Sequence, residues 1–304
     1  MRDIITVLGS LNMDLSIEST KPLKMGETIR GNGFVSGPGG KGANQAVALG
    51  KLGANAHMIG KVGHDLFGQR LTENLKSNGV NVDQLQISKD APTGTAVIIL
   101  HEGNNVIIVD LGANHQVTTE TVHDAEDLIK KSAMLIAQLE VPYEAVREAF
   151  RLARHFGVKT LLNPSPYREI DTELFRCIDI LMANEIEASD MAGVEVRDIP
   201  SAKQAAEVLI KRGIPTPVIT LGAEGCVYAT EGGISHTPAR KVQAVDTTSA
   251  GDSFLGAFAY SLVKGETVDE AAAFAAAASS ITVSRRGAQD SLPSLAEVEA
   301  LFNR

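Results

Sequence analysis

The sequence predicts an α/β protein with a mostly parallel central sheet, helices on both faces of it, and a small β-sheet lid. Apolar β runs alternate with helical patterns along most of the 304 residues, and this alternation is typical of parallel sheets. Two stretches, 11–37 and 92–112, contain strand patterns only. We expect them to join as the lid, which leaves 1–10, 38–91 and 113–304 as the main domain that binds nucleotide and substrate.

Each expected element follows from its local pattern. Short apolar runs between turn residues predict strands: 4–8, 56–61, 95–100, 106–111, 134–138, 159–162, 178–182 and 217–220, with hairpin pieces near Val227 and Ile234 and a hairpin turn at 102–105. Apolar spacings of three and four predict helices: 43–52, 66–77, 119–131, 143–156, one from Glu185, 202–212, 250–264, 267–283 and 294–302. A glycine-rich loop, Gly37 to Gly42, should lead into the first helix.

Composition narrows the function classes. The chain is 44% hydrophobic and 21% charged, as ordinary globular proteins are. Its net charge of −9 argues against nucleic acid or an anionic membrane as a partner. The apolar run Ile4 to Leu8 is too short for a signal sequence, and we expect no membrane span. Two isolated cysteines, Cys177 and Cys226, suit a cytoplasmic protein without a disulfide framework.

The stretch from Asp246 to Phe254 opens the expected helix at Ala250. Free backbone N–H groups in a first helical turn form an anion site. Gly251 costs roughly 1 kcal/mol there relative to alanine, which a ligand approaching the bare backbone would offset. Asp252 places a carboxylate beside this site, where it could take a proton from a bound hydroxyl. Alternatively, Ser249 and Asp252 form a capping box with no role beyond the helix.

The glycine-rich loop matches the spacing of a dinucleotide fingerprint, but it does not follow the first strand as that motif requires. It lacks a Walker A pattern as well. Its bare backbone, the Lys41 ammonium and the Asn44 amide suit a neutral polyol that is being phosphorylated. Asn44 and Asp14 could hold hydroxyls, and Lys41 could neutralise a phosphoryl group. The alternative is a simple turn with a solvated lysine.

Three more strand ends carry polar residues. Glu140 follows one strand, where it could contact a ligand or only begin a helix. Asn184 and Glu187 follow another and could orient a hydrated Mg²⁺, although an asparagine-capped helix explains them equally well. The glycines in Thr220 to Gly225 would let a nucleotide lie against the backbone, but alone they indicate only a turn.

Four motifs occur in a characteristic order: Gly9-Ser-x-Asn-x-Asp14, Gly39-Gly-Lys-Gly-Ala-Asn-Gln-Ala46, Asn184-x-x-Glu187 and Asp246-Thr-Thr-x-Ala-Gly-Asp252. Together they resemble the ribokinase-like (PfkB) family of carbohydrate and nucleoside kinases over essentially the whole chain. The second motif is specific to the ribose-phosphorylating branch and its nearest relatives, whereas Ala-Gly-Asp marks the wider family. The resemblance implies a three-layer α/β/α fold and transfer of the ATP γ-phosphoryl group to the 5-hydroxyl of D-ribose.

The resemblance also implies roles for individual residues. The base would be Asp252, and the anion hole would be formed by Ser249, Ala250 and Gly251. The sugar would be held by Asn12, Asp14, Gly40, Lys41, Gly42, Ala43, Asn44, Glu140 and Asp252. ATP would be bound by Asn184, Thr220, Leu221, Gly222, Ala223, Glu224, Gly225, Gly251, Asp252 and Ala276.

Two ions and a second subunit are implied in the same way. Mg²⁺ would bind near Glu187 through water. A monovalent cation, usually K⁺, would bind largely to backbone carbonyls at Asp246, Thr248, Thr282, Arg285, Gly287 and Ser291. A homodimer through the lid is implied because such lids commonly clasp one another. The chain departs from the family at Ser249, where many members have glycine, and at Ala276, where some have a histidine near the adenine.

Other functions stay open on the sequence alone. Within the kinases, 2-deoxyribose, another sugar or a nucleoside could replace ribose. A dinucleotide (NAD-dependent) oxidoreductase would need the loop from Gly37 to Gly42 to grip a pyrophosphate. A non-catalytic sugar-binding protein would keep Asn12, Asp14 and Asn44 but would not need Asp252.

Overall fold

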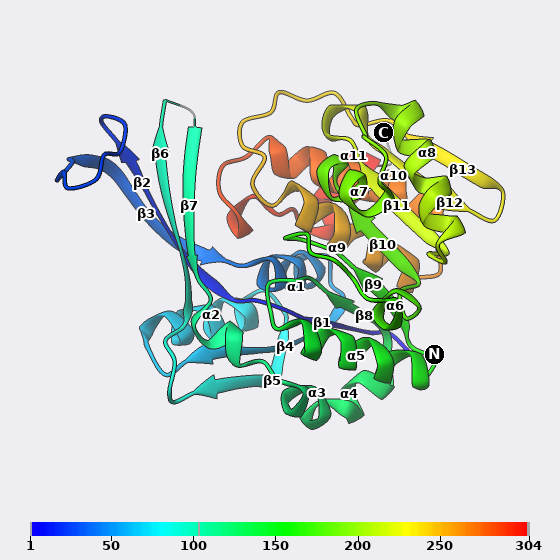
Figure 1. The fold of residues 1–304 in the computed structure, drawn as a ribbon, viewed down its shortest axis with the longest axis horizontal. Coiled ribbons are helices and arrows are strands. Elements are labelled where there is room, and N and C mark those ends of the chain that lie inside the picture. Colours follow the sequence, from blue (N-terminus) through cyan, green and yellow to red (C-terminus); the bar gives the residue numbers. More distant parts are fainter. Residues whose placement is uncertain (1, 103, 303–304) are drawn as a thin grey trace.

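The computed structural model describes residues 2–102 and 104–302 of the chain and has three layers, with helices on both faces of a central sheet (Figure 1). The sheet has nine strands within these ranges. In sheet order they are β13 (Gly233–Thr237), β12 (Cys226–Thr230), β11 (Thr216–Thr220), β10 (Ile180–Ala183), β9 (Lys159–Leu162), β8 (Ser132–Ala137), β1 (Ile4–Leu8), β4 (Asn55–Gly63) and β5 (Asn81–Ser88). Only β12 and β13 are antiparallel to their neighbours, so the predicted fold class is confirmed.

Two apolar cores separate the helical layers. One face of the sheet is covered by α1 (Lys41–Lys51), α2 (Leu66–Ser77), α9 (Ala250–Val263), α10 (Val268–Val283) and α11 (Leu295–Phe302). The opposite face is covered by α3 (Thr119–Asp124), α4 (Glu126–Lys131), α5 (Tyr143–His155), α6 (Thr172–Phe175), α7 (Glu185–Ala192) and α8 (Ile199–Lys211). Short 3₁₀ turns complete the described elements: η1 (Gly112–Gln116), η2 (Gly222–Glu224) and η3 (Gln289–Ser291).

The two strand-only stretches do form one small sheet, which projects from the main body (Figure 1). Its order is β3 (Gly31–Gly39), β2 (Asn12–Ser19), β6 (Gly94–His101) and β7 (Asn104–Asp110). β2 and β6 pair in parallel, although they lie far apart in the sequence. The predicted turn at 102–105 includes residue 103, which is outside the described residues, as are the extreme ends of the predicted main domain, residues 1 and 303–304.

Three expectations about elements were wrong. The strand β5 was not predicted, because this edge strand is only half-buried and lacks a regular apolar alternation. The predicted loop from Gly37 to Gly42 is mostly strand and helix, since β3 continues to Gly39 and α1 begins at Lys41. The predicted helix 119–131 is broken at the buried Ala125, which no glycine or proline marks.

The packing of α1 against α9 brings two remote segments together. A Cβ on Gly256 of α9 would lie 2.7 Å from the Ala48 Cβ of α1, so only glycine permits this separation. Asn44 lies one turn before Ala48, and Asp252 lies one turn before Gly256. The same close contact therefore aligns Asn44 with Asp252 at the N-terminal ends of both helices.

Among the described residues, no helix is both long and apolar enough to cross a membrane.

Candidate active site

Asn12 and Asp14 lie on β2, just after the carboxyl end of β1. Asn12 is buried, and its Oδ1 accepts a hydrogen bond of 2.8 Å from Asn114 Nδ2. Asp14 stands against Gly39, where an added Cβ would lie 2.1 Å from a carboxylate oxygen. Gly39 thus leaves room for the Asp14 carboxylate, and both predicted sugar contacts share one wall of the site.

Glu140 closes the N-terminus of α1. Its Oε2 accepts hydrogen bonds from the Ser10 hydroxyl and from the Lys41 backbone N–H (3.0 Å), while the Gly42 N–H donates to Ser10 Oγ (3.3 Å). Glu140 therefore stabilises α1, rather than the helix that follows it in the sequence. Because these amides are occupied, the loop cannot grip a pyrophosphate as a dinucleotide fingerprint would.

Asp252 is buried, with 7% of its surface exposed, and two side-chain amides hold it. Its Oδ2 accepts from Asn44 Nδ2 at 3.1 Å, and its Oδ1 accepts from Gln45 Nε2 at 2.9 Å. Gln45 in turn contacts Asn163 Oδ1 at 3.3 Å, at the end of β9. These bonds fix the carboxylate in one orientation while each oxygen keeps a lone pair for another donor.

The predicted capping box at the start of α9 is wrong. Ser249 is the residue before the helix, but its φ of 58° is in the left-handed region and its side chain makes no capping hydrogen bond. Its hydroxyl accepts instead from Asn44 Nδ2 at 3.0 Å. A left-handed residue cannot present its side chain to the helix as an extended N-cap does. The Ser249 side chain therefore belongs to the site.

The first turn of α9 is largely open. The Ala250 N–H is occupied by the Thr247 carbonyl (3.2 Å), so it would have to be released before it could bind a ligand. The N–H groups of Gly251 and Asp252 have no acceptor within the described parts of the chain. A Cβ on Gly251 would meet no atom within 4 Å. No packing contact requires this glycine, which leaves the bare backbone facing open space.

Opposite charges gather around Lys41. Burial alone would lower its pKa, but the carboxylates of Asp252, Glu140 and Glu187 raise the pKa of Lys41 overall, so the ammonium stays charged. For Asp14, burial together with the nearby Glu140 and Asp252 raises the pKa to about 7. The site thus holds more carboxylates than its single lysine neutralises, which favours the binding of a cationic or hydrogen-donating group.

Most of the predicted nucleotide residues follow or end β10 and β11, at the same ends of the parallel strands as Glu140, which comes after β8. Asn184 follows β10 and forms a capping box with Glu187, whose Oε2 accepts from the Asn184 N–H at 3.0 Å. Thr220 ends the adjacent parallel strand β11 and starts the turn that carries Gly222 and Gly225. Ala276 is buried in α10. The structure therefore contains both the predicted asparagine cap at Asn184 and the predicted turn after Thr220. Both lie at the carboxyl ends of parallel strands, where ligands bind in open α/β sheets.

Asp252 is linked to the strand between these two regions. Asn163, which contacts Gln45, follows β9 and donates from Nδ2 to the Met182 carbonyl of β10 at 3.0 Å. Gln45 Oε1 also accepts from Gln138 Nε2 at 2.5 Å, just after β8. Asp252 is thus linked to the ends of β8, β9 and β10, between the residues predicted to bind the sugar and those predicted to bind ATP.

The residues expected to bind a monovalent cation lie on two neighbouring segments. The N–H groups of Val245 and Asp246 both donate to the Val283 carbonyl, and Asp246 Oδ2 accepts from the Gly287 N–H at 3.0 Å. Thr248 precedes α9, whereas Thr282, in α10, bonds the Ser253 hydroxyl.

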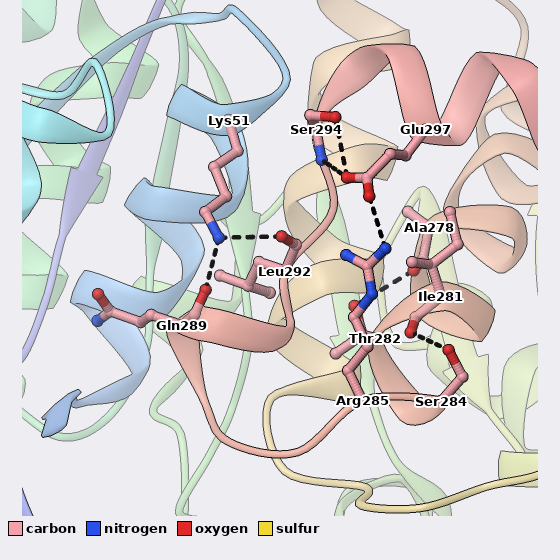
Figure 2. A network of polar contacts seen from close by, with 10 residues as sticks. All are labelled: Lys51, Ala278, Ile281, Thr282, Ser284, Arg285, Gln289, Leu292, Ser294 and Glu297. Carbon is pink, nitrogen blue, oxygen red and sulfur yellow. Dashed lines mark hydrogen bonds and ion pairs between the residues drawn. The ribbon is translucent and has the colours of Figure 1, made fainter.

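Beyond α10, the Arg285 guanidinium points toward the Glu297 carboxylate and donates to it at 2.6 Å (Figure 2). Ser291 is fully buried and donates to the Ala288 carbonyl. The described residues contain no cluster of three or more His, Cys, Asp or Glu side chains that could hold a metal.

Several site residues were not predicted individually. They have amide or hydroxyl side chains that bond a predicted residue directly or, for Asn163, through Gln45: Ser10, Gln45, Asn114, Asn163 and Gln289. Ser10 and Gln45 lie within the quoted motifs, so the sequence could have identified them as site residues. Nothing in the sequence pairs Asn114 with Asn12, because 102 residues separate them.

The raised pKa of Asp14 predicts a pH-dependent stability. Between pH 4 and 7 the folded state keeps a proton that the unfolded chain releases, so wild-type stability falls as pH rises through this window. We expect Asp14→Asn to gain about 1–2 kcal/mol relative to wild type between pH 4 and 7.5. Urea unfolding at several pH values measures this, with the exposed Asp83→Asn as control; parallel curves for wild type and Asp14→Asn would contradict it.

Comparison with known proteins agrees with this geometry. The profile of the family described as "pfkB family carbohydrate kinase" matches residues 3–295. Ribokinase of Haemophilus influenzae is 39% identical over 298 residues, 98% of this chain and 97% of that protein. Deoxyribokinase of Salmonella typhi is 35% identical over 293 residues, 96% of each chain. The structure of Arabidopsis thaliana ribokinase complexed with ribose and ATP superposes with a TM-score of 0.95 at 32% identity, covering 100% of both chains.

The family profile spans nearly the whole chain, and the relatives match it from end to end. The chain belongs to the pfkB family of carbohydrate kinases.

Proposed function

We propose that this protein is an ATP-dependent sugar kinase that phosphorylates D-ribose at the 5-hydroxyl to give D-ribose 5-phosphate. The observation that carries the proposal is the buried Asp252 carboxylate, oriented by Asn44 and Gln45 beside the open first turn of α9. A fixed acceptor for a proton and free N–H groups for an anion are what phosphoryl transfer to an alcohol requires. The similarity to ribokinases supports ribose as the acceptor.

In this proposal, different residues bind the sugar and accept the proton. Asn12, Asp14 and the α1 segment from Gly40 to Asn44 hold the sugar, with Glu140 supporting that segment. Asp252 accepts the proton of the 5-hydroxyl as the oxygen–phosphorus bond forms. The transition state of such transfers is loose, so positioning and charge stabilisation dominate the rate.

The transferred phosphoryl group is placed at the N-terminus of α9. The amides of Ser249, Ala250 and Gly251 form the proposed anion hole once the Ala250 N–H is released from the Thr247 carbonyl, aided by the helix dipole and by the charged Lys41. On the other side, Asn184, the turn from Thr220 to Gly225, and Ala276 line the proposed ATP site. As the bond to the phosphoryl group breaks, ADP is the leaving group.

Two ions fit the donor atoms present. Glu187 keeps its Oε1 free of the capping box, as an oxygen that can hold a hydrated Mg²⁺. Asp246 is somewhat buried, but bonds from Thr248 and Gly287 lower its pKa, so its oxygens suit a cation such as K⁺ together with the nearby carbonyls. Mg²⁺ held near Glu187 would neutralise the phosphates of the nucleotide, and K⁺ held near Asp246 would supply positive charge beside the anion hole. Replacing K⁺ by a large organic cation should lower the kinase activity, and unchanged activity would reject the proposed K⁺ site.

We further propose a homodimer through the small sheet. Its edge strand β7 has four consecutive exposed aliphatic side chains, Val106 to Val109, on both of its faces. Phe34 and Val35 on β3 are also exposed. An exposed apolar strand edge of this kind is normally covered in a native protein, and a second copy of the same sheet is a self-complementary partner.

The cytoplasm is the proposed location, because both cysteines are free thiols, as in a reducing compartment. Subcellular fractionation measures this.

The acceptor test is a coupled ATP-dependent assay with D-ribose, 2-deoxyribose, another pentose and a nucleoside. We expect the highest kcat/KM with D-ribose. A preference for 2-deoxyribose would move the assignment to the runner-up acceptor, which the similarity to a deoxyribokinase supports. Sugar binding without product would favour a binding protein.

In the same assay, Asp252→Asn should lower kcat by about 10³-fold, as the loss of a general base typically does. Ribose affinity, measured by calorimetry without nucleotide, should change by only a few fold because the sugar's other contacts remain. Asp83→Asn is the matched control, because Asp83 is an exposed acid on the edge strand β5, away from the site. A near-normal kcat for Asp252→Asn would remove this residue as the base.

The substitution Gly251→Ala distinguishes an effect on the proposed anion hole from an effect on the stability of α9. The added methyl meets no protein atom, so we expect the free energy of unfolding to stay constant or rise by up to ~1 kcal/mol. The methyl would occupy the space of the incoming phosphoryl oxygens, and kcat should fall at least about tenfold. Gly232→Ala, in an exposed hairpin turn, is the control. Unchanged kcat in Gly251→Ala would place the phosphoryl group elsewhere.

The dimer is tested by Ile108→Glu, which puts a charge on an exposed site of β7. Sedimentation equilibrium should give a dimer for wild type and a monomer for the variant, since burying the carboxylate would be unfavourable. Lys89→Glu, an exposed change away from this strand, serves as the control. A wild-type monomer, or a variant that stays dimeric, would reject this interface.

A further inference from the structure

Gln289 is a buried amide outside every motif quoted above. It begins η3, just after the loop that follows α10, and only 5% of its surface is exposed. Buried side-chain amides are costly unless their polar atoms are paired. Its contacts therefore indicate what it does.

Both ends of the Gln289 amide are used. Nε2 donates to Asn44 Oδ1 at 2.9 Å, and Oε1 accepts from Asn74 Nδ2 at 2.5 Å. Its main chain is held as well, because Lys51 Nζ donates to the carbonyls of Gln289 (2.8 Å) and Leu292 (3.0 Å). Figure 2 shows Lys51 reaching from α1 across to these two carbonyls.

The direction of these bonds follows from Asp252. An ionised carboxylate can only accept, so Asn44 must turn its NH₂ group toward Asp252 Oδ2. The same NH₂ group also reaches Ser249 Oγ. Asn44 Oδ1 then faces the opposite way and requires a donor, which Gln289 Nε2 supplies.

Without such a donor, the Asn44 amide could rotate by half a turn. Its Oδ1 would then face Asp252 Oδ2, and two acceptors in contact repel each other. Both groups are nearly inaccessible to water, with 6% of Asn44 and 7% of Asp252 exposed, so solvent could not relieve the repulsion. The orientation of the base thus depends on which end of Asn44 it meets.

We propose that Gln289 is a positioning residue that selects the productive orientation of the Asn44 amide and thereby holds Asp252 for catalysis. The proposal rests on the kinase function assigned above. Gln289 touches neither reacting atom and acts through Asn44. It also ties the loop containing Gly287 and Ser291, both suggested for the cation, to the acceptor site through one side chain.

The test is a double-mutant cycle of Gln289→Leu and Asn44→Ala. Gln289→Leu alone should lower kcat about tenfold with the KM for ATP unchanged, because only the acceptor side is affected. In the Asn44→Ala background the same change should alter kcat by less than about twofold, since no amide is left to orient. Equal losses in both backgrounds would show that Gln289 acts only through packing, and would overturn the proposal.

Gln289→Glu adds a second discriminator. It preserves size and polarity but replaces the donor with an acceptor, which would favour the rotated Asn44 amide. We therefore expect it to lower kcat more than Gln289→Leu does, and the reverse order would contradict an orienting role. Gln86→Leu is the matched control, because Gln86 also bonds at both ends of its amide, to Asp124 and Thr121, away from the site.

The cycle is also measured by urea unfolding, which needs no activity. Coupled unfolding free energies with additive kcat effects would mean that the contact exists but does not serve catalysis, and the positioning role would fail while the kinase function stood. A wild-type protein that phosphorylates no sugar would instead reject the proposed function. In that case, additive effects of Gln289→Leu and Asn44→Ala on the unfolding free energy would also reject the hydrogen bond between Gln289 and Asn44. Coupled effects would support this hydrogen bond but no role in catalysis.

Discussion

The close contact between α1 and α9 is the constraint on which the site depends. Helices whose side chains interdigitate normally keep their axes 8–10 Å apart, and Gly256 removes the side chain that would hold α9 away from Ala48. One turn nearer the N-termini, this proximity lets Asn44 and Gln45 reach Asp252. The proposed base, Asp252, is therefore oriented by helix packing in the core rather than by a mobile loop, which is how a rigid scaffold preorganises a site.

The two helices use their N-termini differently. At α1, the Glu140 carboxylate and the Ser10 hydroxyl accept hydrogen bonds from the first backbone N–H groups. The Glu140 carboxylate is therefore the anion bound at this N-terminus. At α9, Gly251 leaves the backbone bare, and Ser249 has turned its side chain toward Asn44. Both termini carry the same partial positive charge. Only the N-terminus of α9 can receive an external anion, which is consistent with the proposed separation of a sugar site at α1 from a phosphoryl site at α9.

Charge in the site is arranged for ligands rather than for stability. Burial, together with the nearby carboxylates of Glu140 and Asp252, raises the pKa of Asp14 to about 7 and so disfavours full ionisation of the site. Lys41 balances part of this charge and is kept protonated by it. Sites that bind polar substrates commonly keep such unfavourable groups because the ligand satisfies them. Packing elsewhere, across two continuous apolar cores, compensates for this cost.

The sequence by itself determined the fold class, the small sheet, the start of α9 at Ala250 and the family, because these depend on local periodicity and contiguous motifs. It could not decide between a cap and a site for Ser249, since that depended on a left-handed φ and on Asn44, 205 residues away. Nor could it reveal the bond from Gln289 to Asn44. Tertiary structure alone decided these points, because a hydrogen bond between remote side chains depends on how helices pack, and no local pattern encodes that distance.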